Sequence, residues 1–366
     1  MSGSLILTNK DFIVNILVRN VSIVRCLGVV TMKSIAEICG VSRGTVDRAL
    51  NGRGRVSKET ADNIRKVARQ LGYQPNPAGK ALAARKTCPV IGVVIPAKGN
   101  QFFDEVIRGM EEAAGEYEIY GLQIKYYTVK GYDVQEQLGI LQRIEPEIQA
   151  LVICPINDTL IAGQLNHMLN KGILVITVNN DIDGAGQHYY VGSDYYSGGT
   201  TACALLEALL GTSARIALVV GSKNVLGHRQ RLDGFQQRMC QVADFQLIDV
   251  IEHEDDDILA YDVMCRLLRE HPEINAISIL AAGAYGVCRA VMQLPEEKRP
   301  LVIGFDTVPT TVEMMKKGLI KATIYQHPYR QGYTAINKAF EYLVHGRRPD
   351  KEAYILKNEI KLLENL

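Results

Sequence analysis

The sequence predicts an α/β protein of two unlike parts: a small all-helical module, then a larger domain of two doubly wound parallel sheets. Three observations predict this fold class. Basic residues are concentrated between Met32 and Lys86, where 12 of them accompany only 4 acidic residues. The same stretch holds three short segments with the apolar spacing of amphipathic helices. From Pro89 onward, β-branched runs alternate with helical patterns in two successive series.

The charge distribution separates the two parts more clearly than the total charge does. The whole chain has 41 Lys and Arg against 40 Asp and Glu, so its total charge indicates no partner. Residues 87–366 contain 26 basic and 35 acidic residues, and are therefore acidic. A basic module attached to an acidic remainder predicts a polyanionic partner for the module alone. Charge by itself leaves open the alternative of an ordinary solvated helical face.

Composition and length exclude several classes of protein. We find no apolar run of the roughly 18 residues needed to span a bilayer. The eight cysteines show neither CxxC pairs nor zinc-ligand spacing, so we expect reduced, buried thiols in a cytoplasmic protein without metal or cofactor. Residues 1–30 are apolar but interrupted by Arg19 and Arg25, which does not fit a secretion signal. We expect this extension to be disordered or not native, with translation starting near Val30 or Met32.

The basic module is predicted to contain three capped helices. The first begins after Thr31, a typical N-cap, and ends at Gly40, which suits the left-handed conformation of a helix C-terminus. Ser42 caps the second helix. Because only three residues separate these two helices, they form a helix-turn-helix. Ser57 caps a third helix, whose apolar residues follow the i, i+3, i+4, i+7 pattern from Ile64.

The outer face of the second helix is predicted to contact DNA. In a helix-turn-helix this helix enters the major groove, where an Arg side chain can bind guanine O6 and N7 bidentately. Ser42, Thr45 and Asn51 are placed to hydrogen-bond phosphates. The alternative is three solvated helices with ordinary caps.

The residues 34–77 resemble the headpiece of the LacI/GalR family of bacterial transcriptional regulators. The resemblance rests on the strings "GVS..TV.R.LN", "RVS..T" and "LGY.PN", and it extends from Thr31 over almost the whole chain. One departure is Asp47, where the family usually has Ser. An acidic side chain there repels phosphate or accepts a hydrogen bond from cytosine N4, so operator preference does not carry over from other members.

The segment "PNPAGKALAARK" matches the hinge helix of that family, which folds on operator DNA and inserts a Leu between base steps of the minor groove. Leu82 occupies the matching position; its alternative role is an anchor in a linker. The expected domains are an extension (1–30), a headpiece (31–74), a hinge (75–88) and a two-lobed effector-binding and dimerisation domain (89–366). The expected DNA-contacting residues are Ser42, Arg43, Gly44, Thr45, Asp47, Arg48, Asn51, Arg55, Ser57 and Leu82.

The acidic part is predicted to form two lobes with a ligand site between them. Ligands of doubly wound sheets bind where the carboxyl ends of the strands converge. The resemblance implies a periplasmic-binding-protein fold with a sugar-type ligand in the cleft. We expect one lobe to comprise residues 90–195 with 310–327, and the other residues 196–309 with the C-terminus.

Comparison with ribose-binding-protein-like domains implies specific cleft residues. "NQFF" resembles their Asn-Pro-Phe-Phe loop, and "HRQRLDGFQQ" places Arg229 at their sugar-binding Arg. "VIGFDTVP" and "IYQHP" place Asp306 and Gln326 at their second-lobe carboxylate and Gln. Carboxylates accept hydroxyl donors, guanidinium groups donate in pairs, and aromatic faces cover apolar ring C–H groups. The expected ligand-binding residues are Asn100, Phe102, Phe103, Asn179, Asn180, Arg229, Asp306 and Gln326.

Two departures from the family pattern argue against a plain pentose as ligand. Asn179 and Asn180 stand where the family commonly has Asp-Arg, and residues 281–284 are Ala-Ala-Gly-Ala where Asn-Asp is frequent. A deoxy sugar, a cyclitol or another small polar ligand is then expected. The alternatives are that Asp306 caps a helix, that Arg229 bridges surface helices and that the Phe pair belongs to the core.

No dinucleotide, nucleotide or zinc-protease motif accompanies this pattern: GxGxxG, P-loop and HExxH strings are missing. We therefore predict a cytoplasmic, nucleoid-associated repressor of a sugar or polyol operon. It is expected to bind palindromic double-stranded DNA as a homodimer, without a membrane partner, under the control of a small effector. The alternative function is a periplasmic-type sugar receptor without DNA binding.

Overall fold

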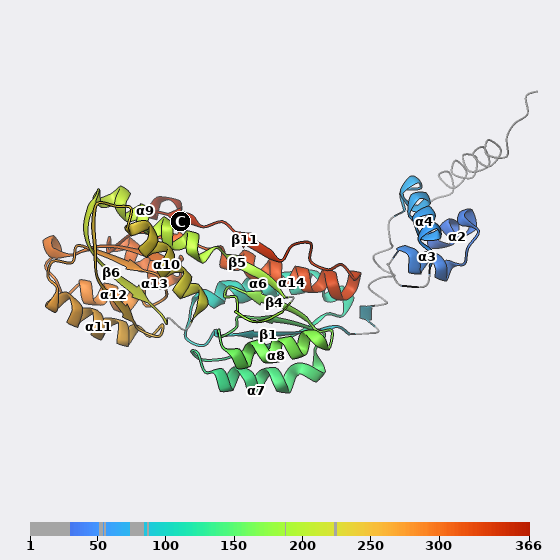
Figure 1. The fold of residues 1–366 in the computed structure, drawn as a ribbon, viewed down its shortest axis with the longest axis horizontal. Helices are drawn as coiled ribbons and strands as arrows, with labels where there is room; N and C mark the ends of the chain where they lie inside the picture. The colour runs from blue at the N-terminus through green and yellow to red at the C-terminus, as the bar shows by residue number, and fades with distance from the viewer. Residues whose placement is uncertain are drawn as a thin grey trace, which may run out of the picture. The chain divides into compact units, whose positions relative to one another are not determined.

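The computed structural model describes residues 30–50, 54, 56–73, 84–85, 88–186, 188–222 and 225–366. The chain divides into two units, residues 1–86 and residues 87–366, each of which is described by itself (Figure 1). Apart from Val30, the predicted extension lies outside the described residues, as does most of the predicted hinge.

The first unit contains the three predicted helices, which are α2 (Met32–Cys39), α3 (Arg43–Leu50) and α4 (Lys58–Gln70). Thr31 and Ser34 form a capping box at the start of α2, and Gly40 ends that helix with φ of 64°. Ile35, Val46 and Ile64 contribute one side chain from each helix to a common core and are fully buried. The predicted helix-turn-helix with a third supporting helix is therefore confirmed.

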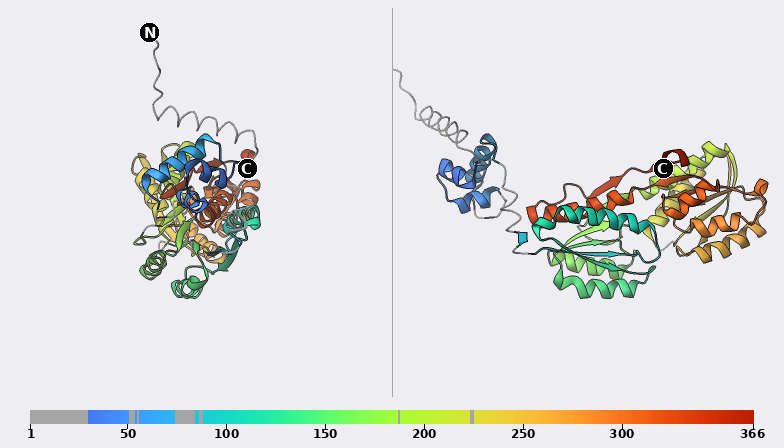
Figure 2. Two further views of the ribbon diagram at one scale, coloured as in Figure 1. Left: turned by 90° about the vertical axis from the view of Figure 1, so that its right-hand side faces the viewer. Right: turned by 180° about the vertical axis from the view of Figure 1, so that it is seen from behind.

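The second unit begins with a lobe built on a six-stranded parallel sheet in the order β11-β5-β4-β3-β1-β2. Its strands are β1 (Val90–Ile95), β2 (Gln123–Thr128), β3 (Ala150–Ile153), β4 (Leu174–Val178), β5 (Tyr189–Ser193) and β11 (Ala353–Leu356). Two helices cover each face (Figure 2). They are α6 (Phe102–Glu116) and α14 (Pro328–His345) on one face, and α7 (Val134–Ile144) and α8 (Thr159–Asn170) on the other.

The second lobe repeats this plan with a sheet in the order β12-β10-β9-β8-β6-β7, in which only β12 is antiparallel. Its strands are β6 (Ser213–Val220), β7 (Asp244–Glu252), β8 (Ala276–Ile279), β9 (Leu301–Phe305), β10 (Ile320–Tyr325) and β12 (Glu359–Lys361). One face packs against α9 (Tyr195–Leu210) and α10 (Leu226–Met239). The other packs against α11 (Asp257–Glu270), α12 (Ala284–Val291) and α13 (Pro309–Lys316). Short 3₁₀ helices lie at Glu118–Tyr120, Glu145–Glu147, Glu296–Lys298 and Leu363–Asn365.

The predicted division between the lobes is wrong for much of the chain after residue 309. Residues 310–327 were expected in the first lobe, but β10 pairs with β9 and so belongs to the second. The chain then returns to the first lobe as α14 and β11, and crosses once more to form β12. Three crossings therefore join the lobes, after β5, after β10 and between β11 and β12.

Glycines bring two pairs of helices into direct backbone contact. A β-carbon added at Gly332 of α14 would lie 1.9 Å from the carbonyl oxygen of Val106 in α6. In the second lobe, a β-carbon at Gly199 of α9 would lie 1.9 Å from the carbonyl oxygen of Arg231, and one at Gly234 would lie 2.2 Å from that of Tyr196. Only glycine permits these approaches, so α10 is held tightly against α9.

The cysteines differ from the prediction in their exposure. Cys154, Cys203 and Cys288 are buried as expected, but Cys88 and Cys240 are exposed. All the cysteines in the described part of the chain are free thiols. Among the helices of that part, none combines the length and apolar character that crossing a membrane requires.

Candidate functional site

The exposed face of α3 forms the first candidate site. Arg43, Gly44 and Arg48 are exposed, whereas Thr45 and Asp47 are partly buried. Arg48 Nη2 donates a hydrogen bond to Thr45 Oγ1 at 3.4 Å, so this side chain lies along the helix. Arg43, in the first turn, keeps its guanidinium available to a partner outside the chain.

The hydroxyls predicted to contact DNA also serve as helix caps. Ser42 Oγ accepts a hydrogen bond from the backbone N–H of Thr45 at 3.1 Å, and Ser57 Oγ accepts one from Thr60 at 3.2 Å. Each cap satisfies a backbone donor at a helix N-terminus and fixes the start of its helix. Asn51, Arg55 and Leu82 lie outside the described residues, so their predicted roles stay predictions.

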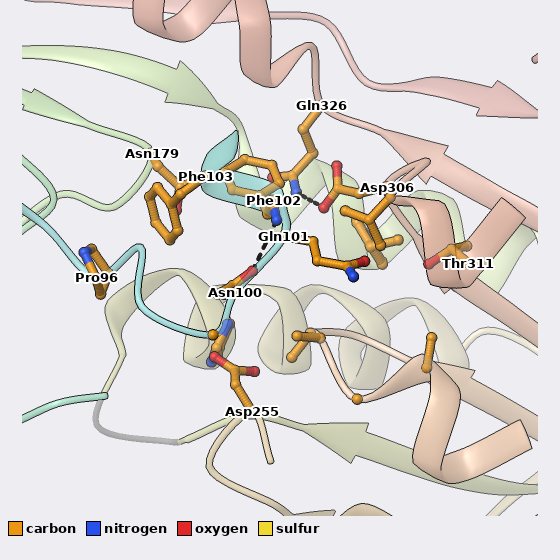
Figure 3. Close-up of a pocket in the computed structure, with 18 of the residues that line it drawn as sticks. Pro96, Asn100, Gln101, Phe102, Phe103, Asn179, Asp255, Asp306, Thr311 and Gln326 are labelled. Atoms are coloured by element: carbon orange, nitrogen blue, oxygen red, sulfur yellow. Dashed lines mark hydrogen bonds between the residues drawn. The ribbon is translucent and has the colours of Figure 1, made fainter. Parts of the chain in front are cut away.

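The second candidate site is a cavity of about 140 Å³ between the two lobes, at the carboxyl ends of the strands. Figure 3 shows side chains from both lobes pointing into it. Seven of the eight predicted ligand-binding residues line this cavity, namely Asn100, Phe102, Phe103, Asn179, Asn180, Asp306 and Gln326.

The first lobe supplies an aromatic and amide wall. Asn100 Oδ1 accepts a hydrogen bond from the backbone N–H of Phe102 at 3.1 Å, which fixes the loop before α6. The rings of Phe102 and Phe103 meet edge to face, with centroids 5.3 Å apart. Both rings belong to the core of the lobe as well as to the cavity wall, so the two roles that the sequence left open coexist. Asn179 follows β4 with φ of 65° and is buried.

A hydrogen-bonded chain of three side chains forms the centre of the cavity. Arg231 Nη2 donates to Gln326 Oε1 at 2.6 Å. Gln326 Nε2 in turn donates to Asp306 Oδ2 at 2.7 Å (Figure 3). The Arg231 guanidinium also lies 3.8 Å from the centroid of the Phe305 ring and 4.5 Å from that of Tyr195. These contacts hold the Arg231 side chain in one position in the cavity wall.

Arg231, and not Arg229, is the arginine of the cavity. The Arg229 side chain is 49% exposed and forms an ion pair with Asp183 at 3.3 Å. Residues two positions apart on a helix point about 200° away from each other, so the two side chains cannot share a face. The string "HRQRLDGF" contains both arginines, and the sequence-based comparison selected the wrong one.

Three buried polar atoms of the cavity wall have no hydrogen-bond partner among the described residues: Arg231 Nε, Asp306 Oδ1 and Asp255 Oδ1. Buried polar atoms in proteins are almost always paired, so a cavity that leaves three of them open is prepared for a polar ligand. The sequence analysis did not include Asp255 or its partner Tyr132, whose hydroxyl donates to Asp255 Oδ2. The signal that could have identified Asp255 is its position just after β7, at the carboxyl edge of the sheet.

Burial shifts the proton affinities of two cavity residues. Burial raises the pKa of Asp306 to about 6, although Arg231 and Gln326 oppose this shift. Burial also lowers the pKa of His228 to about 4. His228 Nδ1 accepts a hydrogen bond from the backbone N–H of Ser222 at 3.2 Å, as expected for a neutral imidazole. At pH 7 the cavity wall therefore contains an ionised but poorly solvated Asp306 and a neutral His228.

We predict that Asp306→Asn stabilises the unliganded protein at pH 7 by about 1–3 kcal/mol while it removes an acceptor for the ligand. Asp306 has φ of 60°, a conformation that Asn adopts readily, so the backbone tolerates the change. Because the folded-state pKa of about 6 exceeds the ordinary value of 3.8, the folded chain binds more protons between these values. The wild type should therefore lose stability as the pH rises from about 4 through 6, and the variant should lose less. Thermal unfolding measured between pH 4 and 8 checks this; identical pH profiles would contradict it.

Comparisons with known proteins agree with both candidate sites. Residues 31–76 match the family described as bacterial regulatory proteins of the lacI family, and residues 91–347 match the periplasmic binding protein domain. The chain belongs to the LacI/GalR family. The predicted recognition and fold class are thus confirmed.

Named relatives of this LacI-family regulator include transcriptional repressors. The ribose operon repressor of Bacillus subtilis is 27% identical over 83% of this chain and 89% of its own length. Catabolite control protein A of Priestia megaterium is 25% identical over 86% of this chain and 92% of its own. Among solved structures, the glucose-galactose binding protein GanP of Geobacillus stearothermophilus is 25% identical with a TM-score of 0.70, covering 76% of this chain and 98% of that one.

Proposed function

We propose that this LacI-family regulator represses a sugar or polyol operon, and that a small polar effector bound between its lobes controls its affinity for operator DNA. The observation that carries the proposal is the set of unpartnered buried atoms of Arg231, Asp306 and Asp255 in the cavity. Two carboxylate acceptors and one guanidinium donor match the hydroxyl groups of a polyol. The edges and faces of Phe102 and Phe103 suit the apolar C–H groups of a sugar or cyclitol ring.

The contacts across the cavity explain how a ligand acts on the whole domain. Asn180 Oδ1 of the first lobe accepts a hydrogen bond from the backbone N–H of Gly227 in the second at 3.2 Å. Asp183 and Arg229 form an ion pair across the same gap, and Tyr132 meets Asp255. A ligand that contacts both walls adds to these interactions and favours closure. We propose that closure changes operator affinity through a coupling of roughly 1–3 kcal/mol.

The remaining parts of the proposal follow from the DNA-binding module. One helix-turn-helix contacts one half-site, so tight specific binding requires two copies on a palindromic operator. We therefore propose a homodimer that acts in the cytoplasm, where operator DNA is found. The relatives that are named regulators or binding proteins support a regulatory role without catalysis.

The proposal is tested by selecting duplexes from a random library with the purified protein and then titrating sugars and cyclitols against the selected duplex. Fluorescence anisotropy is expected to show tight binding that weakens with salt and changes when the effector is added. Thermal unfolding of the same sample should rise with the same effector. Ligand stabilisation without enrichment of any duplex would instead indicate a sugar receptor, and would overturn the proposed function.

A further inference from the structure

Asp255 is a second carboxylate of the cavity, on a different element from Asp306. It lies in the loop between β7 and α11, where both Glu254 and Asp255 have positive φ, of 52° and 57°. A β-carbon added at Gly221, at the end of β6, would lie 2.4 Å from Asp255 Oδ1 and 2.6 Å from His228 Cε1. The glycine therefore makes room for the carboxylate beside the imidazole. Figure 3 shows Asp255 reaching toward the cavity from this loop.

Two described neighbours of Asp255, Tyr132 and His228, are neutral at pH 7. Tyr132 donates its hydroxyl hydrogen to Oδ2, and burial together with the nearby carboxylate raises the pKa of this tyrosine. His228 accepts a backbone hydrogen bond at Nδ1, and burial keeps its pKa near 4. Oδ1 of Asp255 is buried and has no partner among the described residues. No described residue therefore gives this buried oxygen the positive partner that buried charges normally have.

The other charged residues of the cavity do not provide that partner. The described residues that line it include three carboxylates, of Asp255, Asp257 and Asp306, and among these described residues Arg231 has the one guanidinium or ammonium group. Arg231 donates to Leu280 and Gln326, and Gln326 in turn binds Asp306. Asp257 Oδ1 accepts a hydrogen bond from the backbone N–H of Gly286 at 2.9 Å, and it lies in the first turn of α11, where the helix dipole favours negative charge. Oδ1 of Asp255 and Oδ1 of Asp306 both lack a partner among the described residues, but Asp306 is linked to Arg231 through Gln326, and Asp255 has no such link among those residues.

We infer that the effector carries an ammonium group that binds Asp255 Oδ1, and hence that it is an amino sugar or an aminocyclitol. This inference rests on the proposed function of the cavity as the effector site. An ammonium group brings three donors and one positive charge, which matches a wall with more acceptors than donors. The ring hydroxyls of such a ligand remain free to donate to Asp306 and to accept from Arg231 Nε.

The test compares ligands that differ only by an ammonium in place of a hydroxyl. Full-length protein is titrated calorimetrically at pH 7 with D-glucosamine and D-glucose, D-galactosamine and D-galactose, and scyllo-inosamine and scyllo-inositol. In at least one pair, the amino member is expected to bind about 10- to 100-fold more tightly. This preference should decrease as the pH rises through the pKa of the free amine.

Three variants show whether Asp255 causes the preference. Asp255→Asn is expected to remove it, with a smaller effect on the neutral member of the pair. Asp255→Glu keeps the charge and should retain part of the preference. Asp233→Asn removes the same charge from an exposed position of α10 and should leave the preference unchanged. Thermal unfolding of each variant without ligand verifies that it folds.

The experiment distinguishes a failure of the ammonium inference from a failure of the proposed effector site. If the neutral member binds as tightly as the amino member, or if Asp255→Asn weakens both members equally, Asp255 is a hydroxyl acceptor and the inference is overturned while the proposed function stands. If no member of any pair binds and a wider panel of neutral sugars and cyclitols also fails, the effector site itself is refuted and both proposals fall.

Discussion

Replacement of Arg231 by Ala is expected to abolish the response to effector while operator binding persists. Arg231 is 3% exposed, its guanidinium donates to Leu280 and Gln326, and its buried Nε has no partner among the described residues. Its removal takes away a ligand donor and leaves Gln326 and Asp306 without their cationic neighbour. Loss of one member of such a buried polar set costs about 2–5 kcal/mol, which corresponds to a loss of effector affinity of roughly 30- to 4,000-fold.

Arg229→Ala is the matched control, because it removes the same side chain two residues earlier on the same helix. Its ion pair with Asp183 is largely exposed and is expected to contribute about 0–1 kcal/mol. Arg231→Lys adds a second test, since lysine keeps the charge but loses the planar fork that stacks between Phe305 and Tyr195. Anisotropy of the operator complex with and without effector measures all three variants. A normal effector response in Arg231→Ala would show that the ligand binds elsewhere.

Replacement of Arg43 by Ala is expected to lower affinity for the specific operator by about 1–3 kcal/mol, or roughly 5- to 150-fold per half-site. Arg43 lies in the first turn of α3, the part of a recognition helix that faces base edges, and its side chain is exposed. The change should reduce binding to random duplexes much less, because the remaining phosphate contacts are retained.

Arg65→Ala provides the comparison for charge alone, since Arg65 lies on α4, where it forms an exposed ion pair with Asp62. Operator and random duplexes titrated across a salt series separate the two effects. If Arg43→Ala and Arg65→Ala weaken both duplexes to the same extent, Arg43 contributes only charge and does not read bases.

The local features of the headpiece could be predicted from the sequence because their causes are local. Thr31 and Gly40 define the ends of α2 through side-chain capping and a left-handed backbone, both of which involve residues within one turn. The strands of the lobes that were predicted are continuous apolar runs, as expected for parallel strands buried on both faces. β5, β11 and β12 give a weaker signal in the sequence because they are short and rich in tyrosine or polar residues.

The residues of the candidate site were predictable where a short loop or the end of a strand determines their position. Asn100, Phe102 and Phe103 come from one string, and the structure brings all three to the cavity. Which of Arg229 and Arg231 faces the cavity depends on how α10 is rotated about its own axis. The sequence of the helix alone does not reveal this rotation. The contact of Tyr132 with Asp255 joins residues 123 positions apart in the sequence and on different lobes. This contact forms only when the two lobes are in place, so the sequence around either residue does not predict it.

The glycine contact between α9 and α10 has a mechanical consequence for the regulator. The carbonyl oxygen of Arg231 abuts Gly199, so the arginine backbone has no slack in which to yield to an incoming molecule. A shift of the Arg231 backbone therefore requires α9 and α10 to move together. A ligand that displaces Arg231 acts on both helices at once, because Gly199 and Gly234 hold α9 and α10 in direct backbone contact.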